Sequence, residues 1–321
     1  MGKITCRIGI DLGGTKIEAI VIDRNGAELV RKRVATPQGD YRGTLQAIHE
    51  LVEAVEQESG LFGSVGIGVP GAISPATGLI KNANSTILIG HPLDRDLEKL
   101  LQRPVRMTND ANCFALSEAV DGAAAGADSV FGVILGTGVG GGIVIDRKVV
   151  TGANAIAGEW GHNPLPWPKP SEIPGTECYC GKEGCIETFL SGSALQMSYY
   201  RQTEVTRLRS SVQISAQEIA DRAQHGEHDA NEVMERYEHR LARGLATVIN
   251  LMDPKIIVLG GGLSNIDRLY PNVKNLWGEY VFSDEVRTEL LKAKHGDSGG
   301  VRGAAWLWSD HEIWGDNGPS E

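Results

Sequence analysis

The sequence predicts an α/β protein built from two related halves. Apolar runs of strand length alternate with helical patterns along the chain, as in α/β folds. Residues 8–24 (IGIDLGGTKIEAIVIDR) and 131–147 (FGVILGTGVGGGIVIDR) also align without a gap. Each is an apolar run, a glycine-rich turn and a second apolar run, which is the pattern of a β-hairpin. Chance similarity is the alternative, but two such hairpins so far apart indicate that each half starts its own sheet.

The composition is that of a globular protein and argues against several functions. With 321 residues, the chain can bury two cores. A net charge of −10 argues against a nucleic-acid or anionic-membrane surface. No apolar run reaches the roughly 18 residues of a membrane span, and residues 1–7 lack the apolar core of a signal peptide. Five cysteines without an export signal favour reduced thiols. We therefore expect a cytoplasmic protein with no nucleic-acid or membrane partner.

The expected elements follow in order after the first hairpin. The first half should contain a helix over 43–59, a strand over 65–69, a loop over 70–84, a short helix over 93–101, a strand over 105–108 and a helix over 111–119. The second half should contain helices over 216–223 and 229–251, a strand over 255–259 and a last helix over 303–308. Residues 310–321 are polar and are expected to be frayed.

A proline-rich segment of the second half carries a complete tetrahedral ligand set for structural Zn²⁺: His162, Cys178, Cys180 and Cys185. Five prolines between the histidine and the first of these cysteines exclude a helix interior or a central strand. A loop this long needs something to hold it. A metal would do so, and it would fix Glu159 and Glu187, two carboxylates that bracket the ligands and could bind hydroxyl groups. Free thiols beside a structural histidine are the alternative.

Three glycine-rich segments are candidates for binding a nucleotide. Residues 11–16 (DLGGTK) and 136–142 (GTGVGGG) are the two hairpin turns, where several backbone N–H groups can converge on a phosphate. Asp11 could hold Mg²⁺ there. The glycines at 260–262 follow a strand and would let a flat base approach. Ordinary structural turns are the alternative for each segment. Substitutions at Gly138 are therefore expected to impair the binding of the nucleotide alone.

The dipeptide Asn109-Asp110 stands between a predicted strand and a predicted helix. An ionised aspartate there could orient an attacking sugar hydroxyl and accept its proton late in phosphoryl transfer. Asn109 offers a donor and an acceptor to a neighbouring hydroxyl. A helix N-cap is the alternative role for the aspartate.

Five motifs, in this order, resemble the ROK family of sugar kinases, repressors and open reading frames. They are Asp11-x-Gly-Gly-Thr-Lys, Asn109-Asp110, Leu135-Gly-Thr-Gly, Gly158-Glu-x-Gly-His and Cys178-x-Cys-Gly-x-x-Gly-Cys185-x-Glu187. The resemblance covers nearly the whole chain, and the set of motifs is highly specific. Within the family, residues 81–86 (KNANST), 161–167 (GHNPLPW) and 293–298 (AKHGDS) look most like bacterial fructokinases, close to manno(fructo)kinases.

The resemblance implies an actin/hexokinase-like (ribonuclease H-like) α/β fold. It would be a duplicated two-lobe fold with an interdomain active-site cleft. The N-terminal lobe is expected over residues 1–116, with a C-terminal helix at about 301–310 packing back on it. The C-terminal lobe is expected over 117–300 and would carry the zinc-binding loop at 158–187.

The resemblance and the motifs together predict the functional residues. Asp110 would be the catalytic base. The sugar would be bound by Asn84, Asn109, Asp110, Glu159, His162 and Glu187. ATP and Mg²⁺ would be bound by Asp11, Gly13, Gly14, Thr15, Lys16, Gly136, Thr137, Gly138, Gly261 and Gly262. Structural Zn²⁺ would be held by His162, Cys178, Cys180 and Cys185.

The resemblance also implies the reaction. We expect ATP-dependent phosphorylation of a hexose at its 6-hydroxyl, with D-fructose giving fructose 6-phosphate and with mannose and glucose as further acceptors. A glucokinase or an N-acetylhexosamine kinase of the same family is the alternative. A non-catalytic sugar-sensing protein is an alternative of another class. The family resemblance suggests a homodimer.

Overall fold

The chain forms two compact units. The computed structural model describes residues 3–83, 85–203 and 214–315. Unit 1 comprises Met1–Gly126, Gly142–Ala157 and Asp297–Glu321, and unit 2 comprises Ala127–Gly141 and Gly158–Gly296. A boundary at residue 116 would fall inside a helix, α3 (Asp110–Val120), and unit 1 continues past it to Gly126. Residues 142–157 belong to unit 1 because their first residue lies against α3: a Cβ on Gly142 would come 2.6 Å from the carbonyl oxygen of Ala111.

Unit 1 is built on a five-stranded mixed sheet. Its strands, in spatial order, are β3 (Glu28–Ala35), β2 (Lys16–Ile22), β1 (Cys6–Leu12), β4 (Gly63–Val69) and β7 (Val105–Asn109). The strands β1, β2 and β3 pair antiparallel, whereas β1, β4 and β7 run parallel. The carboxyl ends of β1, β4 and β7 therefore meet at one edge, the edge of a parallel sheet at which ligands bind.

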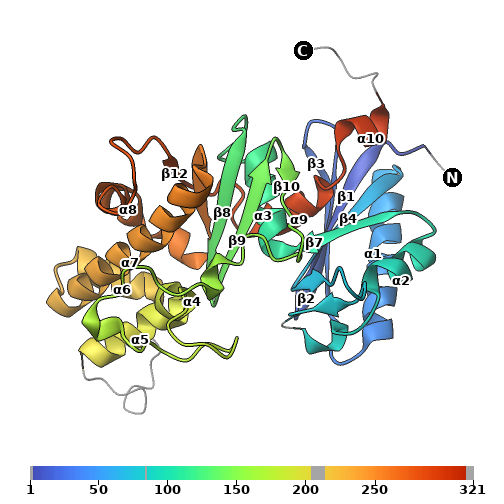
Figure 1. The fold of residues 1–321 in the computed structure, drawn as a ribbon. Coiled ribbons are helices and arrows are strands. Elements are labelled where there is room, and N and C mark those ends of the chain that lie inside the picture. The colour runs from blue at the N-terminus through green and yellow to red at the C-terminus, as the bar shows by residue number, and fades with distance from the viewer. Residues whose placement is uncertain (1–2, 84, 204–213, 316–321) are drawn as a thin grey trace. The chain divides into compact units, whose positions relative to one another are not determined.

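Helices cover both faces of this sheet. Figure 1 shows α1 (Tyr41–Ser59) and α2 (Leu93–Leu101) on one face, with α3 and α9 (Gly299–Ala305) on the other. Side chains alternate along β1, so Ile8 and Ile10 join the core under α1 while Gly9 faces α9. A Cβ on Gly9 would overlap the carbonyl oxygen of Val301, so the glycine lets this short helix lie directly on the sheet.

The C-terminal segment differs from its prediction. The expected helix over 303–308 begins earlier, at Gly299, and ends at Ala305, after which the chain turns and the indole N–H of Trp308 donates to the carbonyl of Val65 at 2.7 Å. The expected frayed segment starts with a helix, α10 (Asp310–Trp314). Two arginines of the sheet hold it: Arg7 pairs with Asp310, and Arg106 pairs with Glu312.

The second sheet repeats the strand order of the first. Its order is β10 (Lys148–Val149), β9 (Val139–Ile145), β8 (Ser129–Leu135), β11 (Ile256–Gly260) and β12 (Glu289–Lys292). The strands β8 and β9 begin and end at the residues that the gapless alignment pairs with the ends of β1 and β2. The strands β8, β11 and β12 run parallel, as β1, β4 and β7 do. The duplication predicted from the repeat therefore extends to the whole sheet.

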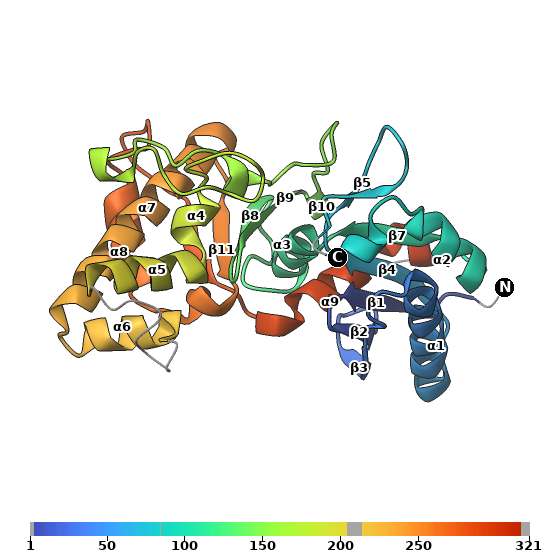
Figure 2. The same ribbon diagram turned by 90° about the horizontal axis from the view of Figure 1, so that it is seen from below.

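The helices of unit 2 gather around one long helix. This helix, α7 (His228–Met252), packs against α5 (Gly192–Gln202), α6 (Ala216–Gln224) and α8 (Leu269–Trp277), as Figure 2 shows. The short α4 (Glu187–Leu190) precedes α5. Two 3₁₀ turns, η2 (Trp160–His162) and η3 (Pro170–Glu172), lie in the proline-rich segment, and η4 (Gly262–Asn265) follows β11. No helix within the described ranges has the length and apolar character needed to cross a bilayer.

Several elements lie outside the predicted set. They include β3, β10, β12, α4, α5 and α8, together with the two-stranded sheet of β5 (Ala72–Ile73) and β6 (Ile80–Lys81) and the 3₁₀ turns η1 (Thr86–Leu88) and η5 (Gly296–Ser298). Most of them are short, and an exposed edge strand such as β3 has little apolar pattern to reveal it.

Candidate active site

The four predicted metal ligands converge at one point of unit 2. Their ligand atoms all lie within 4.8 Å of one another. The Sγ of Cys178 is 3.6 Å from Nδ1 of His162, and the Sγ atoms of Cys180 and Cys185 are also 3.6 Å apart. A tetrahedral zinc with Zn–S bonds of about 2.3 Å requires sulfur atoms roughly 3.7 Å apart. The donor set and its spacing therefore fit Zn²⁺.

The loop that carries these ligands, residues 158–187, is termed the metal loop. It has little regular structure beyond its 3₁₀ turns and is closed by single β-bridges, one between Pro164 and Cys185 and one between Glu177 and Glu183. The N–H of Leu165 donates to the carbonyl of Gly184 at 2.9 Å. Such sparse pairing agrees with the expectation that a metal is needed to hold the loop.

A buried ion-pair cluster anchors the middle of the metal loop to α7. Glu172 accepts bonds from Arg243 at 2.9 Å and from Arg240 at 2.8 Å. Burial alone would raise the pKa of Glu172, but the two guanidinium groups and the N–H of Lys169 outweigh it and lower that pKa to about 2. Sequence reasoning missed this anchor. Its one visible signal is the spacing of the two arginines, one turn apart on a predicted helix.

The carboxylate of Glu187 lies against the second glycine-rich turn. Its Oε2 accepts the N–H of Val139 at 2.9 Å. A Cβ on Gly138 would come within 2.7 Å of the same oxygen. The predicted sugar-binding carboxylate and the predicted phosphate turn are thus direct neighbours within unit 2, and Gly138 lacks a side chain where Glu187 takes the space.

His162 presents one ring nitrogen to the metal ligands and the other to a tyrosine. Its Nε2 is 2.9 Å from the hydroxyl of Tyr179. Partial burial raises the pKa of Tyr179 to about 12, and the charges of Glu187 and Glu159 add to this shift. Both predicted sugar-binding carboxylates therefore lie near this hydroxyl. Glu159 is exposed and immediately precedes η2, the turn that ends at His162.

The first glycine-rich turn, in unit 1, is held by the chain that follows β3. The hydroxyl of Thr36 donates to the carbonyl of Gly13 at 2.7 Å, and the amide of Gln38 donates to the carbonyl of Gly14 at 2.6 Å. The turn closes on itself through the N–H of Gly13 and the carbonyl of Lys16, 3.0 Å apart.

The second turn is held in the corresponding way by different partners. The N–H of Gly192 donates to the carbonyl of Gly136 at 2.7 Å, and the hydroxyl of Ser193 donates to the carbonyl of Thr137 at 3.5 Å. These partners come from the start of α5. The aligned carbonyls of the two turns, Gly13 and Gly14 in the first and Gly136 and Thr137 in the second, thus all accept hydrogen bonds.

Gly261 and Gly262 differ in how strictly glycine is required. Gly261 has φ +78, and a Cβ there would lie 2.5 Å from the carbonyl oxygen of Leu135, the residue before the second turn. Gly262 faces open space, since a Cβ there would meet no atom within 4 Å. The pair therefore lies beside the second turn, as a nucleotide site requires.

Two carboxylates, Asp11 and Asp110, lie near each other at the strand ends of unit 1. Burial raises the pKa of Asp11 to about 6, and the negative charge of Asp110 contributes. Carboxylate oxygens are ligands that Mg²⁺ prefers. A negative charge on one carboxylate makes ionisation of the other less favourable. A divalent cation bound here would stabilise both carboxylates in their ionised form.

Asp110 is not the cap of its helix. The N-cap of α3 is Asn109, whose side-chain oxygen accepts the N–H of Asn112 at 2.9 Å. Asp110 is the first helical residue and is exposed. Its carboxylate accepts the N–H of Ala111 at 2.8 Å and also a bond from its own backbone N–H. Desolvation raises its pKa, and the Ala111 N–H opposes the shift. The alternative role of Asp110 as an N-cap is therefore wrong, and the acceptor predicted on Asn109 is used for capping.

The described structure does not include every predicted residue. Asn84 lies outside the described residues. Thr15 and Lys16 are in the first turn and at the start of β2, beside Asp11.

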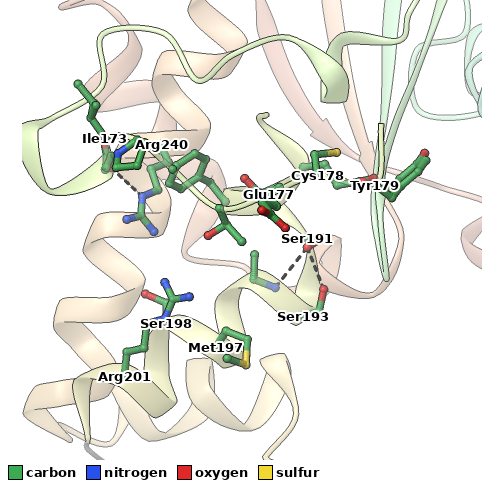
Figure 3. A pocket seen from close by; sticks show the side chains of 18 of the residues that line it. Ile173, Glu177, Cys178, Tyr179, Ser191, Ser193, Met197, Ser198, Arg201 and Arg240 are labelled. Atoms are coloured by element: carbon green, nitrogen blue, oxygen red, sulfur yellow. Dashed lines mark hydrogen bonds and ion pairs between the residues drawn. The ribbon is translucent and has the colours of Figure 1, made fainter. Parts of the chain in front are cut away.

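A pocket of about 750 Å³ lies in unit 2 between the metal loop and α5. Figure 3 shows Glu177, Met197, Arg201 and Arg240 around it, with Tyr179 directed away from Met197 and Arg201. Its lining reaches Thr137 of the second turn. A cavity of this size, lined by both polar and apolar side chains, suits a small organic ligand.

The chain matches the family model of ROK proteins over residues 7–311. The chain belongs to the ROK family. It is 41% identical over 303 residues to the N-acetyl-D-glucosamine kinase of Yersinia pseudotuberculosis serotype O:1b (strain IP 31758), covering 93% of this chain and 97% of that one. It is 42% identical over 303 residues to the N-acetyl-D-glucosamine kinase of Erwinia tasmaniensis, with coverages of 93% and 98%.

Solved structures of the family agree with the fold. The ROK hexokinase from Thermus thermophilus aligns with TM-score 0.81 at 32% identity, over 94% of this chain and 97% of that one. A ROK family glucokinase from Streptomyces griseus, in complex with glucose and AMPPNP, aligns with TM-score 0.74 at 30% identity, over 94% and 98%. The expected actin/hexokinase-like two-domain α/β fold with mixed sheets is confirmed.

Proposed function

We propose that this ROK protein is an ATP-dependent sugar kinase that phosphorylates the 6-hydroxyl of a hexose or hexosamine, with N-acetyl-D-glucosamine as its first substrate. The observation that carries the proposal is the position of the Asp110 carboxylate at the start of α3. The neighbouring Asn109 is the N-cap of the helix, so the Asp110 carboxylate is not needed as the cap, and Asp110 is exposed at the edge where the parallel strands end. Kinases of this family in other organisms support the same activity.

Asp110 is the proposed proton acceptor. The 6-hydroxyl oxygen forms a bond to the γ-phosphorus of ATP as the bond to the β,γ-bridging oxygen breaks, giving ADP. The hydroxyl proton passes to a carboxylate oxygen of Asp110 late in this transfer, since the transition state is loose. Desolvation raises the pKa of Asp110 from its ordinary value, and a raised pKa improves the carboxylate as a proton acceptor.

The two glycine-rich turns are the proposed phosphate sites. The nucleotide residues are those predicted from the motifs: Asp11, Gly13, Gly14, Thr15, Lys16, Gly136, Thr137, Gly138, Gly261 and Gly262. Carbonyls tied down on one side of each turn leave the other side to the N–H groups that bind phosphate. Asp11 would hold Mg²⁺, directly or through water, and the ion would neutralise charge on the transferred phosphoryl group.

The proposed sugar site uses residues of both sequence halves. Unit 1 would supply Asn109 and Asp110, with Asn84 assigned by its motif alone. Unit 2 would supply Glu159, His162 and Glu187, and the contact between Glu187 and the second turn supports a sugar that lies beside the phosphates.

Zn²⁺ is proposed at His162, Cys178, Cys180 and Cys185, in a structural role. Four protein ligands leave no coordination position for a substrate. The ion would supply the folding energy that the metal loop lacks and so fix Glu159, His162 and Glu187.

The choice of sugar rests on relatives rather than on the motifs. The expectation of D-fructose came from short stretches such as residues 161–167. N-acetyl-D-glucosamine kinases that are 40–42% identical over 93% of the chain support the hexosamine alternative better. D-fructose, mannose and glucose stay as second candidates, because a few hydroxyl contacts decide sugar preference. A homodimer is also proposed, and the exposed Leu251 and Phe282 offer apolar surface for it.

The test is ADP release with MgATP and a panel of N-acetyl-D-glucosamine, D-glucose, D-mannose and D-fructose. Phosphorus NMR of the product should locate the phosphate on the 6-oxygen, and Asp110→Asn serves as the inactive control. The proposal fails if no sugar raises ADP release above that control. Sugar binding by calorimetry without turnover would then favour the sugar-sensing alternative.

A further inference from the structure

A row of charged side chains crosses the sheet of unit 1 beside the first glycine-rich turn. In the strand register, Asp11 of β1 lies opposite Glu18 of β2, and Glu18 lies opposite Arg33 of β3. Residues directly opposite each other in antiparallel strands present their side chains on the same face of a sheet. This is the α9 face, because a Cβ on Gly300 of α9 would lie 3.6 Å from the carboxyl group of Asp11. The proposed function gives a role to Asp11 but none to Glu18 or Arg33.

Glu18 is buried in this row and holds Arg33 in a fixed orientation. Only 2% of the Glu18 side chain is exposed. Its Oε2 accepts bonds from Nε of Arg33 at 3.1 Å and from Nη2 at 2.7 Å. Its Oε1 accepts a bond from Arg31, which also pairs with Glu28. Because two N–H groups of Arg33 share one buried acceptor, the plane of its guanidinium is set before any ligand binds.

The other edge of the Arg33 guanidinium is available to a ligand. Within the part of the chain that the structure describes, Nη1 of Arg33 has no hydrogen-bond partner, and 52% of the side chain is exposed. The half-exposed Lys16 of the first turn lies beside it, with Nζ 3.9 Å from Oε2 of Glu18. Burial raises the pKa of Asp11 to about 6, and the charges of Lys16 and Arg33 oppose that shift. Arg33 is therefore near enough to the first turn to act on a ligand that binds there.

We infer that Arg33 is a further phosphate-binding residue of the nucleotide site and that Glu18 positions it. The inference rests on the proposed kinase function, because it takes the first turn as a phosphate site. A guanidinium with a free edge matches phosphate oxygens and keeps its charge at any physiological pH. In a chain of net charge −10, local cations are also needed to attract a polyanion. The alternative is that Arg33 only neutralises Glu18.

The test measures Kd by titration calorimetry, separately for MgATP and for the preferred sugar of the panel. Arg33→Gln should weaken MgATP binding about tenfold or more, the loss of one charge-assisted hydrogen bond, and should leave sugar affinity within threefold of wild type. Lys32→Gln is the matched control. Lys32 is the preceding residue of β3 and carries the same charge, but it lies on the opposite face and pairs with Glu58 of α1 at 2.6 Å. Its substitution should change neither affinity.

A Glu18→Gln background separates phosphate binding from charge neutralisation. If Arg33 binds phosphate, adding Arg33→Gln to this background should again weaken MgATP binding about tenfold. If Arg33 only neutralises Glu18, the double variant should bind MgATP within threefold of Glu18→Gln alone, and this result overturns the inference. The background also removes the buried charge that Arg33→Gln leaves less well paired, so this comparison decides even if the single variant folds poorly. A wild-type chain that releases no ADP with any sugar of the panel instead overturns the kinase proposal.

Discussion

The two glycine-rich turns occupy equivalent places in the two sheets but differ at the second and third of their aligned residues. The first reads Gly13-Gly14-Thr15 and the second Gly136-Thr137-Gly138. The threonine is therefore third in the first turn and second in the second turn. In the second turn, a Cβ at the third position would press on the Glu187 carboxylate at 2.7 Å. Both turns have their first carbonyls tied down, and the second has the predicted sugar-binding residue Glu187 against it.

This difference follows from what each half inserts between its third and fourth strands. Between β3 and β4 the chain forms one helix, α1. Between β10 and β11, the part of the chain that the structure describes forms the metal loop and the helices α4 to α7. The sheet is thus a shared frame, and the longer insertion brings Glu187, the first residue of α4, to the second turn. In a duplicated fold, chemistry is added through the connections rather than through the strands.

Loss of a zinc ligand from the metal loop should have the largest effect on the difference between the two turns. Cys180→Ser removes one zinc ligand, so we expect zinc content to fall from about one per chain to near zero and activity to fall below detection. The second turn would then lose Glu187 while the first turn keeps its partners. Metal analysis and ADP release on the same samples measure both effects. Cys6→Ala, a buried thiol of unit 1, should retain zinc, and full activity in verified zinc-free protein would contradict the prediction.

Catalysis itself should depend on unit 1. Asp110→Asn keeps the shape of the side chain but removes the proton acceptor, so kcat should fall on the order of 10²-fold or more. Folding should be intact because Asn109 caps the helix. Thermal unfolding and kcat are the two measurements, and Asp229→Asn, another first-turn acid, is the matched control. Activity within threefold of wild type would leave Asp110 without a catalytic role.

The sequence predicted the two related sheets and the separate motifs, because both depend on patterns within short stretches of the chain. The hairpin repeat, the apolar periodicity of α1 and α7 and the ligand spacing of the metal loop are visible within short windows. Contacts across long separations were not predictable. Glu172 and Arg243 are 71 residues apart, and Glu187 and Val139 are 48 apart. The helix α10 was missed for the same reason, since Arg7 and Arg106 hold a segment whose own sequence is polar.

The contact between Gly138 and Glu187 changes one expectation drawn from sequence. A substitution at Gly138 was expected to affect only the nucleotide. Gly138→Ala places a methyl group against the carboxylate, so it should raise KM for both ATP and sugar, each by roughly tenfold, the size of one disturbed charged hydrogen bond. Gly278→Ala, where a Cβ meets no atom within 4 Å, is the control. Calorimetry with each ligand separates the outcomes, and an unchanged sugar affinity would show that Glu187 adjusts without loss.

The smallest effect on activity is expected at the second anchor of the metal loop. Glu172→Gln removes the charge that Arg243 and Arg240 bind, and breaking one partner of a buried ion pair costs about 3–5 kcal/mol. The zinc still holds both ends of the loop, so we expect lower stability with kcat within a fewfold of wild type. Arg287→Gln, which removes one partner of an exposed pair, should change stability by less than about 1 kcal/mol.

The pH dependence of this anchor tells it apart from the metal. The pKa of Glu172 is lowered to about 2, against about 4.3 for an unfolded glutamate. A lowered pKa means that the stabilisation is complete above about pH 4.3 and is lost as the pH falls toward 2. Thiolate ligands release zinc on acidification as well, so the comparison is best made in the Cys180→Ser background. In that background, denaturant unfolding gives the free energy of unfolding with and without Glu172→Gln. The difference between the two values should be constant from about pH 8 to 5 and should shrink below about pH 4.3. If Glu172→Gln leaves the free energy of unfolding unchanged at every pH in the Cys180→Ser background, the metal loop detaches from α7 once the metal is gone. In that case zinc, and not the ion pair, holds the metal loop in place.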